Sequence, residues 1–371
     1  MSTDPHLETP SGKPRARSLG ITLPGNPGRL NAITDVPGLE VGLTTLIAGE
    51  HVRTGVTAIH PRGRDGAGDA YAAGFHALNG NGEMTGISWI EESGTTSGPI
   101  AITNTHAVGP AHEGIVRWTA DRHPELAEAW LLPVAAETWD GYLNDINGRH
   151  VRAEDTVAAL DAATGGAMEE GSVGGGTGMC CYDFKGGTGT ASRVVAYGGA
   201  SYSVGVLVQA NFGTRSELMI AGTPLGEALA DDNPLSEWEG SSGAGSVIAI
   251  VATDAPLLPH QCRALARRVP IGLGRTGTTG SHFSGDLFLA LSTGNPGGFT
   301  PGRTTMFGHA DGTFDELRFV PWGFMDAFFA AVVYATEEAV LNALVANEDM
   351  VGLHGRRVPA LPRDRVAKIL A

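Results

Sequence analysis

The chain passes from the small-residue segment Glu239-Gly240-Ser241-Ser242-Gly243-Ala244-Gly245 directly into the apolar run Ser246-Val247-Ile248-Ala249-Ile250-Val251-Ala252-Thr253. Two interpretations fit this pattern. One is a flexible turn before an ordinary buried strand, because glycine and serine are common in such loops. The other is a peptide bond, between Gly245 and Ser246, that the protein cuts itself. Cleavage there would give Ser246 a free α-amine beside its hydroxyl, so one residue could act as nucleophile and base.

The composition excludes several classes of protein. The chain has 40 Asp and Glu residues against 25 Lys and Arg residues, a formal charge of −15. Such a balance disfavours a nucleic-acid partner, because phosphate binding needs a basic face. The 54 glycines follow no fixed period, which excludes collagen and simple repeats. The three cysteines and twelve histidines show no zinc-binding spacing, so we expect no metal.

The sequence shows neither a membrane-spanning segment nor an apolar signal core. No apolar window reaches the roughly 18 residues of a membrane span. The nearest, 322–345, is interrupted by Asp326, Glu337 and Glu338 and fits a buried helix better. Residues 1–20 are polar and rich in Pro, Ser and Arg, without an apolar signal core. We expect them to form a disordered lead-in, and we expect a cytoplasmic protein.

Apolar periodicity predicts strands and helices in mixed order. Near-continuous apolar runs predict strands at 87–90, 99–103, 193–197, 203–210, 246–253 and 286–293. Helical patterns cover 110–122, 154–163, 257–269, 322–347 and 363–370. Regular strand–helix alternation is weak, and 192–210 reads as two adjacent strands joined at Gly198-Gly199. We therefore predict an α/β protein with two packed sheets and helices outside them, in one domain over residues 21–371.

Two glycine-rich blocks, 173–179 and 184–189, do not form a nucleotide site. A phosphate-binding loop needs Lys-Ser/Thr after its last glycine, whereas Lys185 precedes its glycines, and GxGxxG is absent. The blocks fit tight turns near a site, and we expect no cofactor. The Gly-x-Ser-x-Gly elbow of an α/β-hydrolase is absent as well.

Three polar features at strand ends each allow two interpretations. Asp286, after Ser284-Gly285, is either a turn residue or a group that orients a hydroxyl or amine. The block 137–145 interleaves three acids with Trp139 and a tyrosine, which fits a solvated loop or a pocket for a cationic amine. Asn211 follows an apolar run, and its amide is either a turn former or an oxyanion donor.

Taken in order, these segments resemble the DmpA-type aminopeptidases, which include the L-aminopeptidase/D-amidase-esterases and the β-peptidyl aminopeptidases. The resemblance spans roughly residues 21–370 and is carried by several motifs. They are Gly25-Asn26-Pro27-Gly28, Asn31-Ala32-Ile33-Thr34-Asp35-Val36, 137–144, 174–178, Gln209-Ala210-Asn211, 245–257 and Ser284-Gly285-Asp286. It implies an αββα four-layer sandwich similar to that of N-terminal-nucleophile hydrolases, with its own connectivity.

The same resemblance implies how such a chain works. The precursor cleaves itself into an α chain, 1–245, and a β chain, 246–371, which assemble as a homo-oligomer of αβ heterodimers. Such enzymes remove N-terminal residues from small peptides, amides and esters and need no metal. Ser246 is the implied nucleophile, with Ser284 and Asp286 beside its amine and hydroxyl. Asn211 is the implied oxyanion donor, with Tyr142 near it.

The resemblance gives less guidance on substrate recognition. Glu137 is our candidate for holding the substrate's ammonium group, with Trp139 as a neighbouring substrate-binding residue. Leu43 departs from the family, since many relatives have His there, and we assign it no role. Alternatives are a β-peptide-specific aminopeptidase, an endo-amidase of the nylon-oligomer type and a non-catalytic binding protein. Relatives of the nylon-oligomer type use Thr as nucleophile, so Ser246 argues against that alternative.

Overall fold

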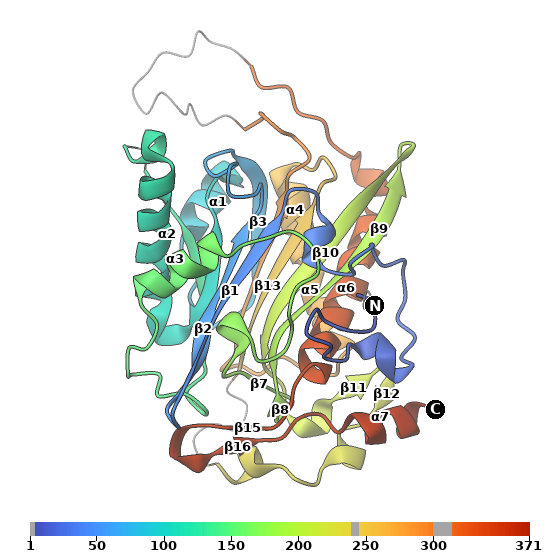
Figure 1. Ribbon diagram of the computed structural model, residues 1–371. Coiled ribbons are helices and arrows are strands. Elements are labelled where there is room, and N and C mark those ends of the chain that lie inside the picture. The colour runs from blue at the N-terminus through green and yellow to red at the C-terminus, as the bar shows by residue number, and fades with distance from the viewer. Residues whose placement is uncertain (1–3, 129, 239–244, 300–313) are drawn as a thin grey trace.

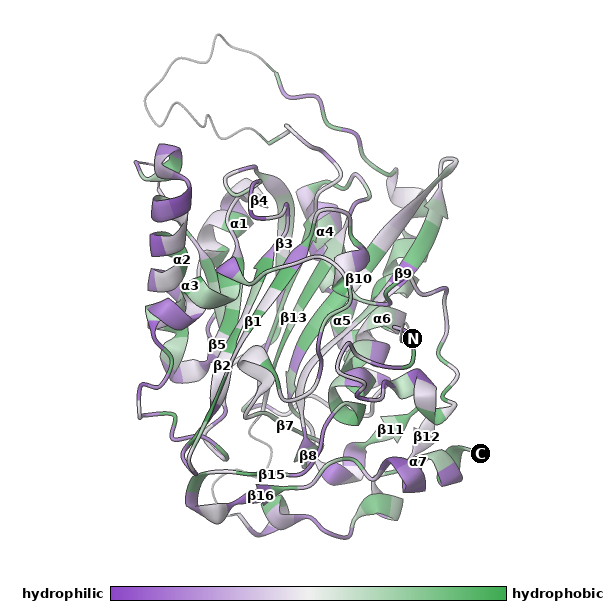
Figure 2. Cartoon of the chain, viewed as in Figure 1, coloured by the Kyte–Doolittle hydropathy of each residue, from purple (hydrophilic) through white to green (hydrophobic). Residues whose placement is uncertain are grey.

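Two β-sheets pack face to face, and helices cover both outer faces (Figure 1). The computed structural model describes residues 4–128, 130–238, 245–299 and 314–371. Hydrophobic residues gather on the central strands, whereas the outer helix α2 is largely hydrophilic (Figure 2). The predicted αββα sandwich is therefore confirmed.

The smaller sheet has the order β1-β2-β5-β6. Its neighbours pair antiparallel, except β5 and β6, which are parallel. Helices α2 and α3 cover its outer face, and α2 turns Ala111, Ile115 and Trp118 inward at helical spacing. The element bounds are β1 Glu40–Ala48, β2 Val52–His60, β5 Ile100–Asn104, β6 Val134–Thr138, α2 Val108–Arg122 and α3 Ala153–Asp161.

The larger sheet has the order β4-β3-β14-β13-β10-β9, and helices α4, α5 and α6 cover its outer face. Strands β13 and β14 lie at its centre, pair in parallel and are buried at every residue. The bounds are β3 Tyr71–Gly80, β4 Thr95–Thr96, β9 Gly187–Tyr197, β10 Ala200–Asn211, β13 Ser246–Thr253, β14 Gly285–Ser292, α4 Pro259–Ala266, α5 Val269–Gly274 and α6 Asp326–Val345.

Strand β13 lies between two hydrophobic cores, and this position explains why its sequence is apolar throughout. Ile248, Ile250 and Ala252 pack into the core between the two sheets, whereas Val247 and Val251 pack towards the outer helices. Successive side chains of a strand point to opposite faces, so a strand covered on both faces needs apolar residues at every position. Each fully buried large aliphatic side chain contributes about 1.5–3 kcal/mol.

The remaining elements are short and lie around this sandwich. Helix α7 is among them and matches the predicted bounds. The bounds are α1 Ile87–Ser93, α7 Arg363–Leu370, β7 Cys180–Cys181 with β8 Phe184–Lys185, β11 Met219–Ile220 with β12 Thr223–Pro224, and β15 Met350–Val351 with β16 Arg357–Val358.

Three predictions of secondary structure were wrong or incomplete. Residues 87–90 form the start of α1 rather than a strand, after Gly86 turns the chain at a φ of 77°. The helix expected at 257–269 is two helices, because Pro270 in the first turn of α5 has no N–H to continue α4. Strands β1, β2 and β3 were missed, since Thr, Gly and His interrupt their apolar alternation.

Helix α6 is long and apolar enough to cross a membrane by length and composition alone. In the fold, however, 83% of that apolar window is buried. It packs against the large sheet together with α4 and α5. This agrees with the prediction of a buried core helix.

Residues 4–20 differ from the expected disordered lead-in, because they are anchored by buried charge. The Arg15 side chain is 3% exposed and forms an ion pair of 2.6 Å with the fully buried Glu170. It also donates to the carbonyls of Asn31 and Thr190, both at 2.8 Å. A buried guanidinium needs such partners, so this segment is part of the fold.

Replacing Arg15 with Ala should therefore destabilise the protein by about 3–5 kcal/mol, since the Glu170 carboxylate stays buried without its partner. Burial already raises the pKa of Glu170, and losing Arg15 raises it further. A raised folded pKa makes stability fall as pH rises, so the loss should be larger at pH 8 than at pH 5. Urea unfolding midpoints measure this.

The matched control is Arg117→Ala, which removes an exposed ion pair with Glu154. Exposed pairs contribute little, so its midpoint should stay close to that of the wild type. Equal midpoints for the two variants would contradict the anchoring role of Arg15.

Candidate active site

Ser246 is the first residue of β13, at the centre of the larger sheet. The register places it opposite Asn211 of β10 on one side and Gly285 of β14 on the other. Its side chain is buried. The preceding segment 239–244, whose flexibility the sequence analysis emphasised, lies outside the described residues.

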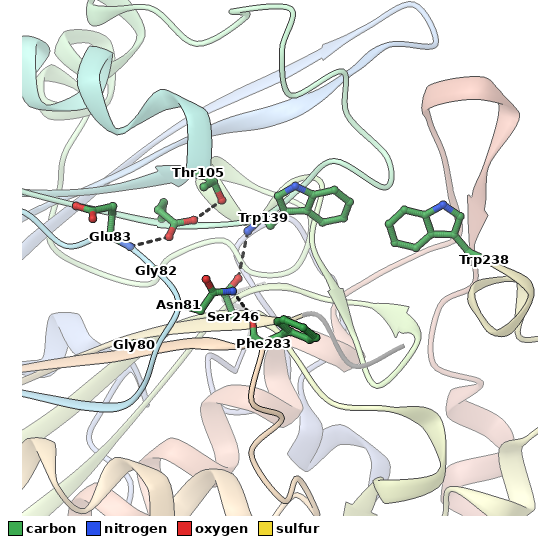
Figure 3. Close-up of a pocket in the computed structure, with 11 residues that line it drawn as sticks. Gly80, Asn81, Gly82, Glu83, Thr105, Trp139, Trp238, Ser246 and Phe283 are labelled. Atoms are coloured by element: carbon green, nitrogen blue, oxygen red, sulfur yellow. Dashed lines mark hydrogen bonds between the residues drawn. The ribbon is translucent and has the colours of Figure 1, made fainter. Parts of the chain in front are cut away.

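Two N–H donors converge on the Ser246 hydroxyl oxygen. The backbone N–H of Trp139 donates to Oγ at 3.1 Å (Figure 3). Asn211 Nδ2 donates to the same oxygen at 3.3 Å. The Asn211 amide is fixed in turn, because Oδ1 accepts from the Cys180 N–H at 2.8 Å and Nδ2 donates to the Trp139 carbonyl at 2.8 Å. Donors fixed in this way stabilise negative charge that develops at this place.

The glycine block 174–178 allows the chain to pass close behind this network. A Cβ on Gly175 would lie 2.1 Å from Gln209 Oε1, so only glycine fits there. Lys185 is buried and donates to the carbonyls of Met179 and Gly186, both at 2.8 Å. Burial lowers the pKa of Lys185 to about 7. The glycines thus serve tight turns and close packing near the site, as the sequence predicted. Lys185 joins the two blocks through its hydrogen bonds to backbone carbonyls.

Ser284 and Asp286 flank Gly285, the partner of Ser246 in the neighbouring strand. The Ser284 hydroxyl donates to Asp286 Oδ1 at 2.5 Å, and Asn79 Nδ2 donates to Oδ2 at 2.9 Å. Burial raises the pKa of Asp286, and these donors pull it back down because they favour the charged form. Because Gly285 pairs with Ser246, its two neighbours Ser284 and Asp286 lie beside the main chain of Ser246.

Glu137 lies at the end of β6, with both carboxylate oxygens engaged. Oε1 accepts from the Glu83 backbone N–H at 2.8 Å, and Oε2 accepts from the Thr105 hydroxyl. Burial raises the pKa of Glu137, while these two donors lower it. The carboxylate is thus held in one orientation at the wall of a cavity.

That cavity has a volume of about 500 Å³ and contains the predicted residues Glu137, Trp139, Gly245 and Ser246 in its wall. Among the described residues, Asn211, Tyr142, Ser284 and Asp286 do not line it. The full lining is Gly80, Asn81, Gly82, Glu83, Thr105, Glu137, Trp139, Trp238, Gly245, Ser246 and Phe283.

Several lining residues were missed by the sequence analysis. Asn81 and Glu83 belong to the stretch Asn79-Gly80-Asn81-Gly82-Glu83, whose alternating amides and glycines mark a turn after β3. This turn pattern could have drawn attention to the segment. Thr105, Trp238 and Phe283 carry no such signal, because only the fold brings their separate loops together.

Tyr142 lies behind the cavity wall. Its buried ring packs edge-on against Trp238, with a centroid distance of 5.2 Å, in a cluster with Leu143 and Val358. Its predicted position near Asn211 therefore stays a prediction. Leu43, the departure from the family pattern, lies on β1 and packs against the core between the sheets.

Comparison with known proteins agrees with this geometry. The model of the family described as "Peptidase family S58" matches residues 31–358. The β-peptidyl aminopeptidase BapA of Sphingosinicella microcystinivorans is 46% identical, with 96% of this chain and 92% of that protein aligned. This chain belongs to peptidase family S58. BapA of Sphingosinicella xenopeptidilytica is 45% identical, over 96% of this chain and 91% of that protein.

Solved structures match the whole sandwich. The L-aminopeptidase D-Ala-esterase/amidase of Ochrobactrum anthropi, called a prototype for the serine aminopeptidases with a variant of the Ntn hydrolase fold, has a TM-score of 0.89. It is 46% identical, with 96% of this chain and 98% of that chain covered. A β-aminopeptidase of Burkholderia sp. has a TM-score of 0.86 at 45% identity, with the same coverage. The predicted DmpA-type hydrolase is thereby confirmed.

The Asn79–Asp286 contact gives a testable pH dependence. Replacing Asn79 with Ala removes a donor that favours the ionised carboxylate, so the pKa of Asp286 should rise further. The acid limb of kcat/KM should then move to higher pH. The pH–rate profile on an aminoacyl p-nitroanilide measures the shift. Asn147→Ala, which removes an exposed amide bonded to His106, should leave the limb in place; identical shifts would refute the assignment.

Proposed function

We propose that this S58-family aminopeptidase cuts its own Gly245–Ser246 bond and then works through an acyl-enzyme on Ser246. Its substrates are small peptides, amides and esters with a free N-terminal amine. One observation carries the proposal. A buried serine hydroxyl receives two N–H donors in a cavity that also holds the Glu137 carboxylate.

The surroundings of Gly245 support self-cleavage. The Gly285 N–H donates to the Gly245 carbonyl oxygen at 3.2 Å, which polarises the bond to be cut. Ser246 Oγ attacks the Gly245 carbonyl carbon and forms an ester bond. The C–N bond breaks, and the hydroxyl proton passes to the peptide nitrogen, which leaves as the Ser246 amine. Water then hydrolyses the ester, which gives a carboxylate on Gly245 and restores the hydroxyl of Ser246.

The new amine supports the second reaction. A protein α-amine has a pKa of about 7.7–8.0, so a useful fraction is neutral at physiological pH. It takes the Ser246 hydroxyl proton as Oγ attacks the substrate carbonyl and gives it to the leaving amine or alcohol. Trp139 and Asn211, whose N–H groups converge at Ser246 Oγ, are our candidate donors to the oxyanion that develops beside it. Water finally releases the acyl group, and Ser284 and Asp286 help to position the amine.

Glu137 supports the requirement for a free N-terminus. Its oriented carboxylate faces the same cavity as Ser246 and can pair with the ammonium group of a substrate. An endo-amidase cuts inside a chain, so its substrate has no free amine beside the cut bond for this carboxylate to bind. β-Peptides are the second candidate substrate, because two relatives at 46% and 45% identity are named β-peptidyl aminopeptidases. Alanyl and β-alanyl p-nitroanilides compared in one assay separate the two preferences.

We further propose that the αβ heterodimers assemble into a homo-oligomer. Phe319, Trp322 and Phe324 are large apolar side chains that lie exposed on one short segment. Contiguous exposed apolar side chains often mark a contact surface. Sedimentation velocity of the active protein measures the assembly.

Replacing Ser246 with Ala should abolish both self-cleavage and hydrolysis. Denaturing electrophoresis of this variant should show one chain of 38.3 kDa. The wild type should instead give two fragments, the smaller beginning Ser-Val-Ile-Ala-Ile on N-terminal sequencing. An active wild-type protein that consists of a single uncut chain would refute the proposal.

Replacing Glu137 with Gln should weaken selection for a free amine. A charged partner in a buried pair contributes about 2 kcal/mol or more, so kcat/KM on alanyl p-nitroanilide should fall about 30-fold or more. Propionyl p-nitroanilide lacks the amine and should be a poor substrate for wild type and variant alike. Glu125→Gln, an exposed carboxylate, is the control. Equal losses on both substrates would show that Glu137 is structural.

A further inference from the structure

Aromatic rings make up much of the cavity wall that Glu137 does not occupy. Trp139 and Trp238 stack with ring centroids 5.6 Å apart and planes inclined by 15°. Phe283 lines the same cavity and is 56% exposed. The mechanism above uses only the backbone N–H of Trp139 and neither of the other two residues. Apolar rings left exposed at a cavity are candidates for contact with a ligand.

Trp238 is fixed from several sides although it lies in a loop after the 3₁₀ turn Pro234–Glu237. Tyr142 packs edge-on against it, and the Arg356 guanidinium carbon lies 5.5 Å from its ring centroid. Arg356 also donates to the Tyr142 carbonyl at 3.3 Å. A ring held in this way loses little conformational freedom when a ligand packs on it.

The arrangement of the cavity indicates which part of a substrate meets these rings. Thr105 and Glu83, which hold the Glu137 carboxylate, lie on one side of Ser246, and Trp238 lies on the other (Figure 3). An amine bound at Glu137 and a carbonyl at Ser246 define the direction of the substrate. The group that leaves on acylation then extends towards Trp139 and Trp238.

We propose that Trp238, stacked on Trp139, forms a subsite for the leaving group and selects flat, aromatic ones. The favoured substrates are aminoacyl amides and dipeptides whose second residue, or amine, carries an aromatic ring. Offset stacking and burial of such a ring favour it over a methyl group. The inference rests on the proposed function, since Glu137 sets the direction of the substrate.

The test compares two substrates with one acyl group, L-alanyl-phenylalanine amide and L-alanyl-alanine amide. Both give the same acyl-enzyme, so the ratio of their kcat/KM values reports only leaving-group contacts. We expect a ratio of about ten for the wild type. Trp238→Ala should lower it to about two or less, and Trp238→Phe should keep most of it. Trp130→Ala removes a tryptophan that is 82% exposed and does not line the cavity, and it should not change the ratio.

Product inhibition gives a second measurement on unmodified enzyme. The probes are the two leaving-group products without their α-amine, so that neither is a substrate or binds at Glu137. 3-Phenylpropionamide should inhibit the wild type competitively at least fivefold more strongly than propionamide. This measurement decides the question if Trp238→Ala does not fold or is not processed. A wild-type ratio near one, equal inhibition by the two amides, or an unchanged ratio in Trp238→Ala would overturn the subsite.

Failure of the subsite and failure of the proposed function give different results. Hydrolysis of propionyl-phenylalanine amide as fast as alanyl-phenylalanine amide by the wild type would remove the free-amine requirement and overturn the direction assigned to the substrate. A retained amine requirement together with a Trp238-independent ratio would overturn the subsite alone.

Discussion

The pairing of β10 with β13 is the constraint on which the site depends. Its register places Asn211 opposite Ser246, and the Asn211 amide then connects the Ser246 hydroxyl to Trp139 and Cys180. A slip by one residue would send every side chain of β13 to the other face and move the serine away from its donors. The apolar cores on both faces of β13 oppose such a slip, so hydrophobic packing fixes the hydrogen-bond geometry.

Two carboxylates near Ser246 are buried, and in both cases hydrogen-bond donors offset the cost. Burial raises the pKa of Glu137 and of Asp286, and each carboxylate accepts two directed hydrogen bonds that favour the ionised form. Fixed donors keep such a group charged without exposing it to water, and the low local dielectric strengthens its attraction for an amine. The acidic excess of the chain adds no such specificity, because exposed charges are screened.

Sequence patterns predicted those parts of the molecule whose burial is local and continuous. Strand β13 matches its predicted bounds because an unbroken apolar run follows a small-residue loop, and Asp286 stood out at the mouth of a second such run. The partners from other loops could not be predicted in this way. Thr105, Trp238 and Phe283 meet only after both sheets have formed, and strands β1 to β3 carry too many Thr and Gly residues for a clear alternation.

The position of Ser246 at the first residue of a central strand bears on both proposed reactions. In the uncut chain its nitrogen belongs to the peptide bond whose carbonyl accepts the Gly285 N–H. After cleavage the same nitrogen would be the general base, and strand pairing on both sides would hold it where the peptide nitrogen had been. A nucleophile on a mobile loop would lose this position once its chain was cut. Placing it inside the sheet allows one geometry to serve both maturation and turnover.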